Sequence, residues 1–236
     1  MSAFVWCLFQ LSQLDVSALT EKLEAARTTY DVSVAESVLA QARTSAPEDL
    51  AVLRVRIDAA LLVAELHRIA WEQLPESDIA HRRPIGEQID AAAEEALTVL
   101  DKLPEDSERY RIHADLLGVM IRSDFRAKKY RKDMEAHAAK AVALDAKNAL
   151  AYVSLAKPFV FADVNVGGDP AKAIELLSQA IALAPNLESA LCLRGLAYQK
   201  ANKADLARAD WESALAKNPA CAPAKRELAK LSTISK

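Results

Sequence analysis

The C-terminal half of the chain repeats itself with a period of 34 residues, which leaves few folds open to it. Similar residues recur at this spacing and in the same order in four pairs: Pro185 and Pro219, Ala173 and Ala207, Leu177 and Trp211, and Ala180 and Ala214. A period of about 20 to 50 residues indicates supersecondary units that stack, because no single unit can bury its own apolar face. The chain is therefore predicted to be a repeat protein.

The composition indicates that the repeated units are helical. Hydrophobic residues make up 52% of the chain but aromatic residues only 6%, so most of the apolar residues are small or aliphatic, chiefly alanine and leucine. Both residue types lose little side-chain entropy in a helix. Only five glycines are available for tight turns. These features predict an all-α protein.

The last unit carries a pattern of large and small residues: Leu191, Gly195, Tyr198, Ala207, Trp211, Ala214 and Pro219. Small residues at 195 and 207 allow two antiparallel helices to approach where they cross, and the large residues fill the space beside the crossing. This pattern resembles the tetratricopeptide repeat (TPR). The resemblance implies a right-handed superhelical array of antiparallel helix hairpins, a TPR-like α-solenoid.

Extending this register backwards predicts about five hairpins and a C-terminal capping helix. An apolar N-terminal segment, residues 1–15, precedes a single helical repeat domain, 16–236. Its units are 16–49, 50–106, 107–148, 149–187 and 188–221, with the cap at 222–236. In the second unit, a long helix over 48–74 pairs with one over 85–103, and the stretch 81–84, which ends in a proline, is predicted to be a loop. Asp169 and Pro170 predict a helix start.

The N-terminus allows two interpretations. Residues 1–14 carry no charge and are rich in apolar side chains, but they are too few to span a bilayer. They either cover the first hairpin or are the remnant of a signal sequence. The three cysteines, Cys7, Cys192 and Cys221, are scattered and predict free thiols in a reducing compartment. A cytoplasmic protein is expected, or an exported or periplasmic one if the segment is a signal remnant. No transmembrane span is predicted.

No constellation for catalysis is evident, so an enzyme is not expected. The four histidines have no metal-ligand spacing, and no glycine-rich phosphate loop is present. The pair Gly167 and Gly168 is better explained as a turn before the Asp169 helix cap. We expect no cofactor and no metal. The net charge of −3 offers no general attraction for nucleic acid.

A basic stretch is the first candidate for a functional surface. Between Arg122 and Lys132 six cationic residues are opposed only by Asp124. The stretch is predicted to lie in an extended hairpin loop, where it can contact an anionic partner. The residues assigned to this basic loop are Arg126, Lys128, Lys129, Arg131 and Lys132.

The concave surface that the TPR resemblance implies is the second candidate. By register, its first helices would present Asp115, Val119, Arg122, Val153, Lys157, Val160, Cys192, Leu196 and Gln199. This mixed apolar and polar set suits a peptide or helix of another protein. The predicted function is thus a protein-binding scaffold or adaptor, and self-association is left open. The alternative is a ligand-binding accessory protein of an exported or transporter-associated system.

Overall fold

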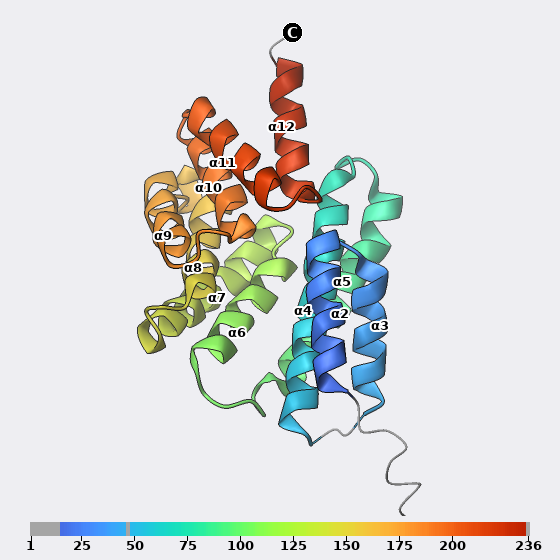
Figure 1. The fold of residues 1–236 in the computed structure, drawn as a ribbon. Coiled ribbons are helices and arrows are strands. Elements are labelled where there is room, and N and C mark those ends of the chain that lie inside the picture. The colour runs from blue at the N-terminus through green and yellow to red at the C-terminus, as the bar shows by residue number, and fades with distance from the viewer. Residues whose placement is uncertain (1–14, 46–47, 235–236) are drawn as a thin grey trace, which may run out of the picture.

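The computed structural model describes residues 15–45 and 48–234, which form an array of antiparallel helix hairpins (Figure 1). These residues contain eleven α-helices. Five hairpins are followed by a single helix: α2 (Val16–Thr29) with α3 (Val32–Arg43), α4 (Leu50–Gln73) with α5 (Ile79–Leu100), α6 (Ser107–Met120) with α7 (Asp124–Leu144), α8 (Ala149–Phe161) with α9 (Pro170–Leu183), α10 (Glu188–Lys200) with α11 (Ala204–Lys217), and then α12 (Ala222–Ile234). The predicted all-α hairpin array is confirmed.

Side-chain caps explain where most of the helices begin. Eight of the described helices start after an Asp, Asn or Ser whose side chain accepts a hydrogen bond from the first turn. Such caps satisfy backbone N–H groups that have no partner inside the helix. The predicted cap at Asp169 is present: its carboxylate accepts from the Lys172 N–H at 3.0 Å, and Pro170 opens α9.

The TPR-like register is visible in the packing of the last hairpin. Ala207 and Ala214 are completely buried, as is the ring of Trp211, which lies against Gly195. The Trp211 Nε1–H donates to the carbonyl oxygen of Cys192 at 3.1 Å, so the ring is held across the hairpin. Beyond this hairpin, α12 packs Leu228 and Leu231 against the same cluster, as predicted for the capping helix.

Two predicted loops are helical, and both predictions were wrong. The stretch 81–84 lies in the first turns of α5, because Asp78 caps the helix earlier and accepts from the His81 N–H at 3.3 Å. Pro84 removes only the hydrogen bond to Ala80, a residue that is exposed to water. The residues assigned to the basic loop, from Arg126 to Lys132, also lie in a helix: α7 begins after Ser123, since lysine, arginine and alanine are good helix formers even where no core covers them.

The two ends of the array contact each other, although in a simple repeat array each unit contacts only its neighbours. The Tyr30 hydroxyl at the end of α2 donates to Glu188 at 2.8 Å, a residue 158 positions away at the start of α10. The Asn218 amide donates to the Thr28 carbonyl at 2.9 Å. On the other side of the junction, Arg226 pairs with Glu72 at 3.1 Å. The first two hairpins therefore contact the last hairpin and its cap.

The apolar segment predicted over residues 1–15 lies, up to residue 14, outside the described residues. Within the part that the structure describes, no helix combines the length and the apolar character needed to cross a bilayer.

Two glycines shape the connection between α8 and α9. Gly167 has φ of +92°, and a Cβ on Gly168 would lie 2.1 Å from the Ala162 carbonyl oxygen, so the predicted turn requires glycine at both positions.

Candidate functional site

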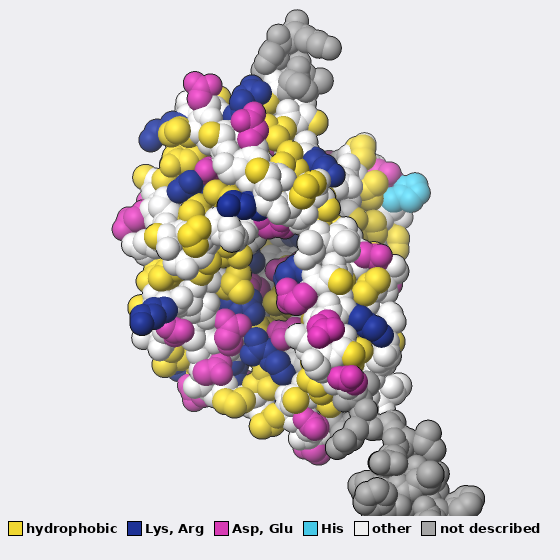
Figure 2. Space-filling view, viewed as in Figure 1, with side chains coloured by type: hydrophobic (Ala, Val, Ile, Leu, Met, Phe, Trp, Pro, Cys, Tyr) yellow, Lys and Arg dark blue, Asp and Glu magenta, His cyan; other side chains and the backbone are white. Residues whose placement is uncertain are grey.

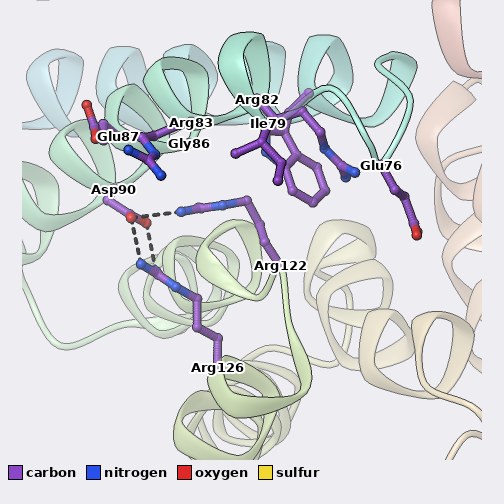
Figure 3. A pocket seen from close by; sticks show the side chains of 10 residues that line it. Glu76, Ile79, Arg82, Arg83, Gly86, Glu87, Asp90, Arg122 and Arg126 are labelled. Atoms are coloured by element: carbon purple, nitrogen blue, oxygen red, sulfur yellow. Dashed lines mark hydrogen bonds and ion pairs between the residues drawn. The ribbon is translucent and has the colours of Figure 1, made fainter.

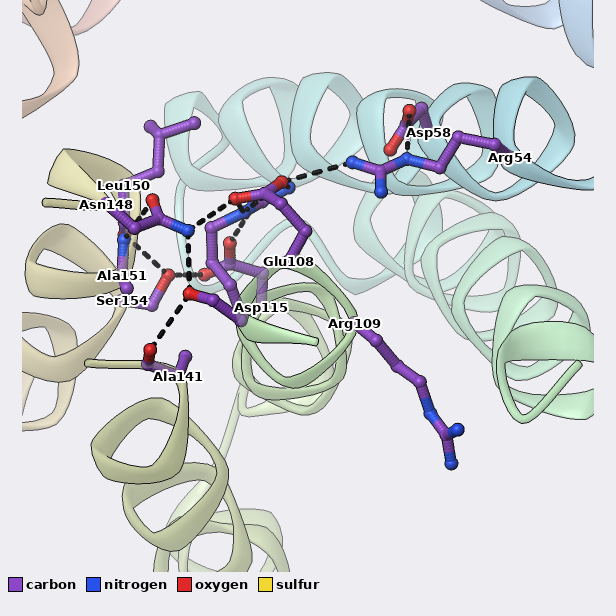
Figure 4. Close-up of polar contacts among 12 residues, drawn as sticks. Arg54, Asp58, Glu108, Arg109, Asp115, Ala141, Asn148, Leu150, Ala151 and Ser154 are labelled. Carbon is purple, nitrogen blue, oxygen red and sulfur yellow. Dashed lines mark hydrogen bonds and ion pairs between the residues drawn. The ribbon is translucent and has the colours of Figure 1, made fainter. Parts of the chain in front are cut away.

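The inner surface of the array is hollowed and lined by charged side chains (Figure 2). The first helices of successive hairpins pack in order here, α4 against α6 and α6 against α8. Their charges pair across the helices (Figure 4). Glu108 of α6 lies between Arg54 of α4 and Arg111 of its own helix, at 3.0 Å from each, and accepts from the Asn148 amide at 2.6 Å. The inner surface is therefore an ion-pair network and not an apolar groove.

Asp115 is the centre of this network. Its buried carboxylate accepts from Lys157 at 2.6 Å, from Arg111 at 2.7 Å and from the Ser154 hydroxyl at 2.8 Å. Burial alone would raise the pKa of Asp115, but the two cations outweigh it and lower the pKa overall. Lys157 also faces Glu65 of α4 at 3.9 Å. The network links three hairpins. Removing one of its members would leave a buried charge without a partner, which is strongly destabilising.

Most of the residues predicted to line the groove are buried. Val153, Val160 and Cys192 expose 3%, 1% and 6% of their surface, and Val119 is also buried. Asp115 and Lys157 belong to the ion-pair network, and Arg122 pairs with Asp90 at 2.7 Å. Leu196 and Gln199 are half-exposed, as are Arg122 and Lys157. Neighbouring hairpins cover the buried members, so these side chains are not accessible to a partner in this structure.

The basic stretch separates into two groups. Arg126 forms two hydrogen bonds with Asp90, at 2.7 and 2.8 Å, and turns toward α5. Arg131 pairs with Glu135 at 2.7 Å and donates to the carbonyl oxygens of Val166 and Gly167, the latter at 2.6 Å. The remaining cations, Lys128, Lys129 and Lys132, are exposed and form no ion pair with any residue that the structure describes.

These three lysines lie on one face of α7 together with Phe125. The spacing 125, 128, 129 and 132 follows the helical repeat, and the opposite face of the same helix carries the buried Met134 and Ala138. Beside this face lies the 3₁₀ turn η1 (Val164–Val166), which Arg131 ties to α7. We call the exposed residues of this region the α7 surface: Phe125, Lys128, Lys129, Lys132, Val164 and Val166.

The structure also assembles a pocket of about 390 Å³ that the sequence did not indicate (Figure 3). It lies where α5 faces the loop before α7, and Arg122 and Arg126 join Arg82, Arg83 and Asp90 in its wall. Residues 79, 82, 83, 86 and 90 share one face of α5. This helical spacing could have predicted the wall of the pocket from the sequence. Because Pro84 led to the assignment of residues 81–84 to a loop, the spacing was not recognised.

Two pairs of titratable side chains that can change their protonation or redox state lie outside these surfaces. His113 and His137 stack with ring centroids 3.8 Å apart, and burial, then the neighbouring imidazole, lowers the pKa of His113 to about 4. The thiols of Cys192 and Cys221 share a hydrogen bond at 3.3 Å and form no disulfide. A contact with Cys192 lowers the pKa of the Cys221 thiol to about 7. Across residues 15–45 and 48–234, no three His, Cys, Asp or Glu side chains are placed to hold a metal ion.

Comparison with known proteins supports the fold. Neither a scan against protein-family models nor a search of curated proteins found a match. Among solved structures, the chain is similar to TTC0263, a thermophilic TPR protein of Thermus thermophilus, with 14% identity, coverage of 90% of this chain and 97% of that chain, and a TM-score of 0.57.

Other solved structures match at lower TM-scores, among them MamA and YrrB. MamA is 18% identical over 86% of this chain and 91% of that chain, with a TM-score of 0.38. YrrB, described as a TPR protein with an unusual peptide-binding site, is 13% identical over 90% of this chain and 98% of that chain, with a TM-score of 0.42. The likeness to TTC0263, together with the Gly195 and Trp211 packing, shows that the chain has the fold of a TPR protein.

Proposed function

We propose that this chain is a protein-binding scaffold without catalytic activity, and that its partner binds the α7 surface. The observation that carries the proposal is the combination of three exposed lysines without ion-pair partners among the described residues and three exposed apolar side chains, which lie on α7 and on the turn that Arg131 ties to it. The inner surface is a weaker candidate, because its charges already neutralise one another and most of its predicted contact residues are buried.

The apolar members of the α7 surface are unusually exposed for their type. Phe125, Val164 and Val166 expose 77%, 73% and 67% of their surface. A single exposed apolar residue requires no explanation, but a group of them beside charged residues is typical of an interaction site. The two valines are held in place by Arg131, whose guanidinium binds the backbone of the turn. The region is therefore ordered before any partner arrives, which lowers the entropy lost on binding.

The charges indicate the chemistry of the partner. Lys128, Lys129 and Lys132 follow the same helix face over about one turn, and Lys129 lies 4.6 Å from the ring centre of Tyr130. A complementary segment would present acidic residues to these lysines and apolar residues to Phe125 and the two valines. An acidic amphipathic helix of another protein meets both requirements.

Site-specific photo-crosslinking tests the location of the partner. A photoreactive amino acid at position 129 should capture a protein from the source cell that the same residue at position 217 does not capture. Lys217 provides the comparison because it is exposed on α11, away from the α7 surface. The captured protein is identified by mass spectrometry, purified and used for affinity measurements.

Charge reversal tests the chemistry. Changing Lys128, Lys129 and Lys132 to Glu should weaken binding of the purified partner at least about tenfold at low salt, mainly by slowing association. A matched variant that reverses the exposed Lys147, Lys203 and Lys217 makes the same change in net charge and should retain affinity.

Two results would contradict the proposal. One is equal loss of affinity in both triple variants, because this would indicate a response to net charge alone. The other is crosslinking from position 199 but not from position 129, since Gln199 is half-exposed on α10 among the predicted groove residues. That result would return the partner to the inner surface.

A further inference from the structure

The two arginines at the start of the basic stretch, Arg122 and Arg126, point toward Asp90 of α5 and line the pocket at the tips of the second and third hairpins (Figure 3). Asp90 of α5 lies between them. It accepts from Arg122 Nη2 at 2.7 Å and from Arg126 Nη1 and Nη2 at 2.8 and 2.7 Å. Burial raises the pKa of Asp90, but the hydrogen bonds from the two guanidinium groups outweigh it and lower the pKa, so the carboxylate stays charged.

One carboxylate does not satisfy two guanidinium groups. The Arg122 side chain exposes only 9% of its surface, and its Nη1 is buried without a hydrogen-bond partner among the described residues. A buried donor without an acceptor is costly and rare in folded proteins. Since Arg122 lines the pocket, an acceptor that enters the pocket from outside can supply the missing hydrogen bond.

A second arginine in the same pocket is also incompletely bonded. Arg82 Nε is buried without a hydrogen-bond partner among the residues that the structure describes, and the guanidinium of Arg82 lies 3.6 Å from the ring centre of Trp71. Arg83 is exposed, lines the same pocket and forms no ion pair within the described part of the chain. Two unsatisfied N–H groups and an unpaired guanidinium therefore belong to one concave site.

The balance of charges in the pocket favours an anion. Four arginines line it, against the carboxylates of Asp90, Glu76 and Glu87, so one positive charge is in excess. Guanidinium groups bind carboxylates and phosphates through paired hydrogen bonds. Trp71 and the exposed Ile79 add an apolar part to the wall. The volume of about 390 Å³ lies in the range of small-molecule sites.

We propose that this arginine pocket binds a small ligand that carries one oxyanion group, a carboxylate or a phosphate, joined to an apolar group. The oxyanion lies against Arg83 and Arg122 and accepts the N–H of Arg122 that has no partner among the described residues. The apolar group packs beside Trp71 and Ile79. This site shares no residue with the α7 surface, so ligand binding here can be tested independently of the proposed partner binding.

Binding of four small probes to the full chain tests the proposal: phenyl phosphate, phenylacetate, inorganic phosphate and acetate, compared at equal ionic strength with chloride as the reference anion. Affinities are measured by calorimetry, and the Nε–H resonance of Arg82 is followed by NMR. We expect a phenyl-bearing probe to bind more tightly than the matching simple anion and to shift the Arg82 resonance. The better of the two phenyl probes identifies the oxyanion as phosphate or carboxylate.

Two arginine variants place the site. Arg122→Gln should weaken the better probe by about ten- to a hundredfold, the effect of losing a charged hydrogen bond. Arg83→Gln removes an exposed side chain without an ion pair among the described residues, so the fold should remain intact while affinity still falls several-fold. Arg208→Gln is the matched control, since Arg208 is exposed on α11 and likewise forms no ion pair within residues 15–45 and 48–234.

The failure of this site is distinguishable from failure of the α7 surface. The triple lysine variant should bind the probes as the unaltered chain does. No binding of any probe at millimolar concentration would overturn the proposal. So would equal affinities in Arg83→Gln, Arg208→Gln and the unaltered chain, because the anion would then be bound elsewhere.

Discussion

The contact between Gly195 and Trp211 makes the last hairpin sensitive to a single methyl group. A Cβ at position 195 would lie 2.4 Å from Trp211 Nε1 and 2.8 Å from two of its ring carbons. Such distances lie well inside van der Waals contact, so the ring would have to move. Trp211 is completely buried and its Nε1–H donates to the Cys192 carbonyl, so movement disturbs both packing and a hydrogen bond. Gly195→Ala should therefore destabilise the protein.

The expected loss of stability is the balance of three effects. Overpacking of a core costs about 1–3 kcal/mol. Leaving the buried indole N–H without an acceptor costs about 1–3 kcal/mol more. Alanine in place of glycine within a helix returns about 1 kcal/mol. The net loss is roughly 3 kcal/mol, which corresponds to a fall in Tm of about 6 to 12 °C for a chain of this size.

Gly118→Ala is the matched control, because Gly118 occupies the comparable first helix of the third hairpin. A Cβ there meets only the flexible end of Met134, at 3.1 Å from Cε and 3.4 Å from Sδ. Methionine readily adjusts, so this variant should melt at or slightly above the temperature of the unaltered chain. Thermal unfolding followed by far-ultraviolet circular dichroism measures both variants.

A double-mutant cycle identifies the cause. If the clash with the indole is responsible, Gly195→Ala should cost little in a chain that already carries Trp211→Leu. The reasoning is refuted if Gly195→Ala melts no lower than the Gly118→Ala control. It is also refuted if the effect of Gly195→Ala is the same whether or not the indole is present.

Two further predictions concern titration and oxidation. Because burial depresses the pKa of His113 to about 4 in the folded state, the unfolded chain binds more protons between about pH 6.5 and 4, and stability should fall as the pH is lowered through this window. The loss is on the order of 1 kcal/mol after allowance for the partial exposure of the ring, and urea unfolding should show it disappear in His113→Gln. Mild oxidation with diamide should join Cys192 and Cys221, whose sulfurs are 3.3 Å apart, and mass spectrometry of peptides should detect the link. Recovery of both thiols unmodified would contradict this.

The helix hairpins could be predicted from the sequence because their determinants are short-range. The small residues at 195, 207 and 214 and the large ones at 191 and 211 describe contacts inside one hairpin and with the next. The Asp169 cap likewise acts within its own first turn. Interactions of this kind recur with the repeat, and a period of 34 residues makes them recognisable in one sequence.

Helix ends without apolar periodicity were harder to predict. The residues of the basic stretch have no spacing that indicates a buried face, yet α7 includes them because Ser123 caps the helix and the residues themselves favour helix. Pro84 argues for a loop, but the cap at Asp78 starts α5 before it and the lost hydrogen bond lies at an exposed turn. In such stretches one residue favours a helix and a neighbouring residue disfavours it, and the capping geometry decides whether the helix forms.

Only the tertiary structure decided which charged side chains are exposed and which are buried or paired. The junction of Tyr30 with Glu188 joins residues 158 positions apart, and it results from small rotations added from one hairpin to the next. No local sequence pattern predicts the total rotation along the array. Ion pairs with Asp90 turn Arg122, just before α7, and Arg126, in its first turn, toward the pocket, while Lys128, Lys129 and Lys132 face water. The sequence by itself determined an array of helix hairpins, whereas the accumulated rotation and packing of whole hairpins determined which charges are paired, buried or exposed.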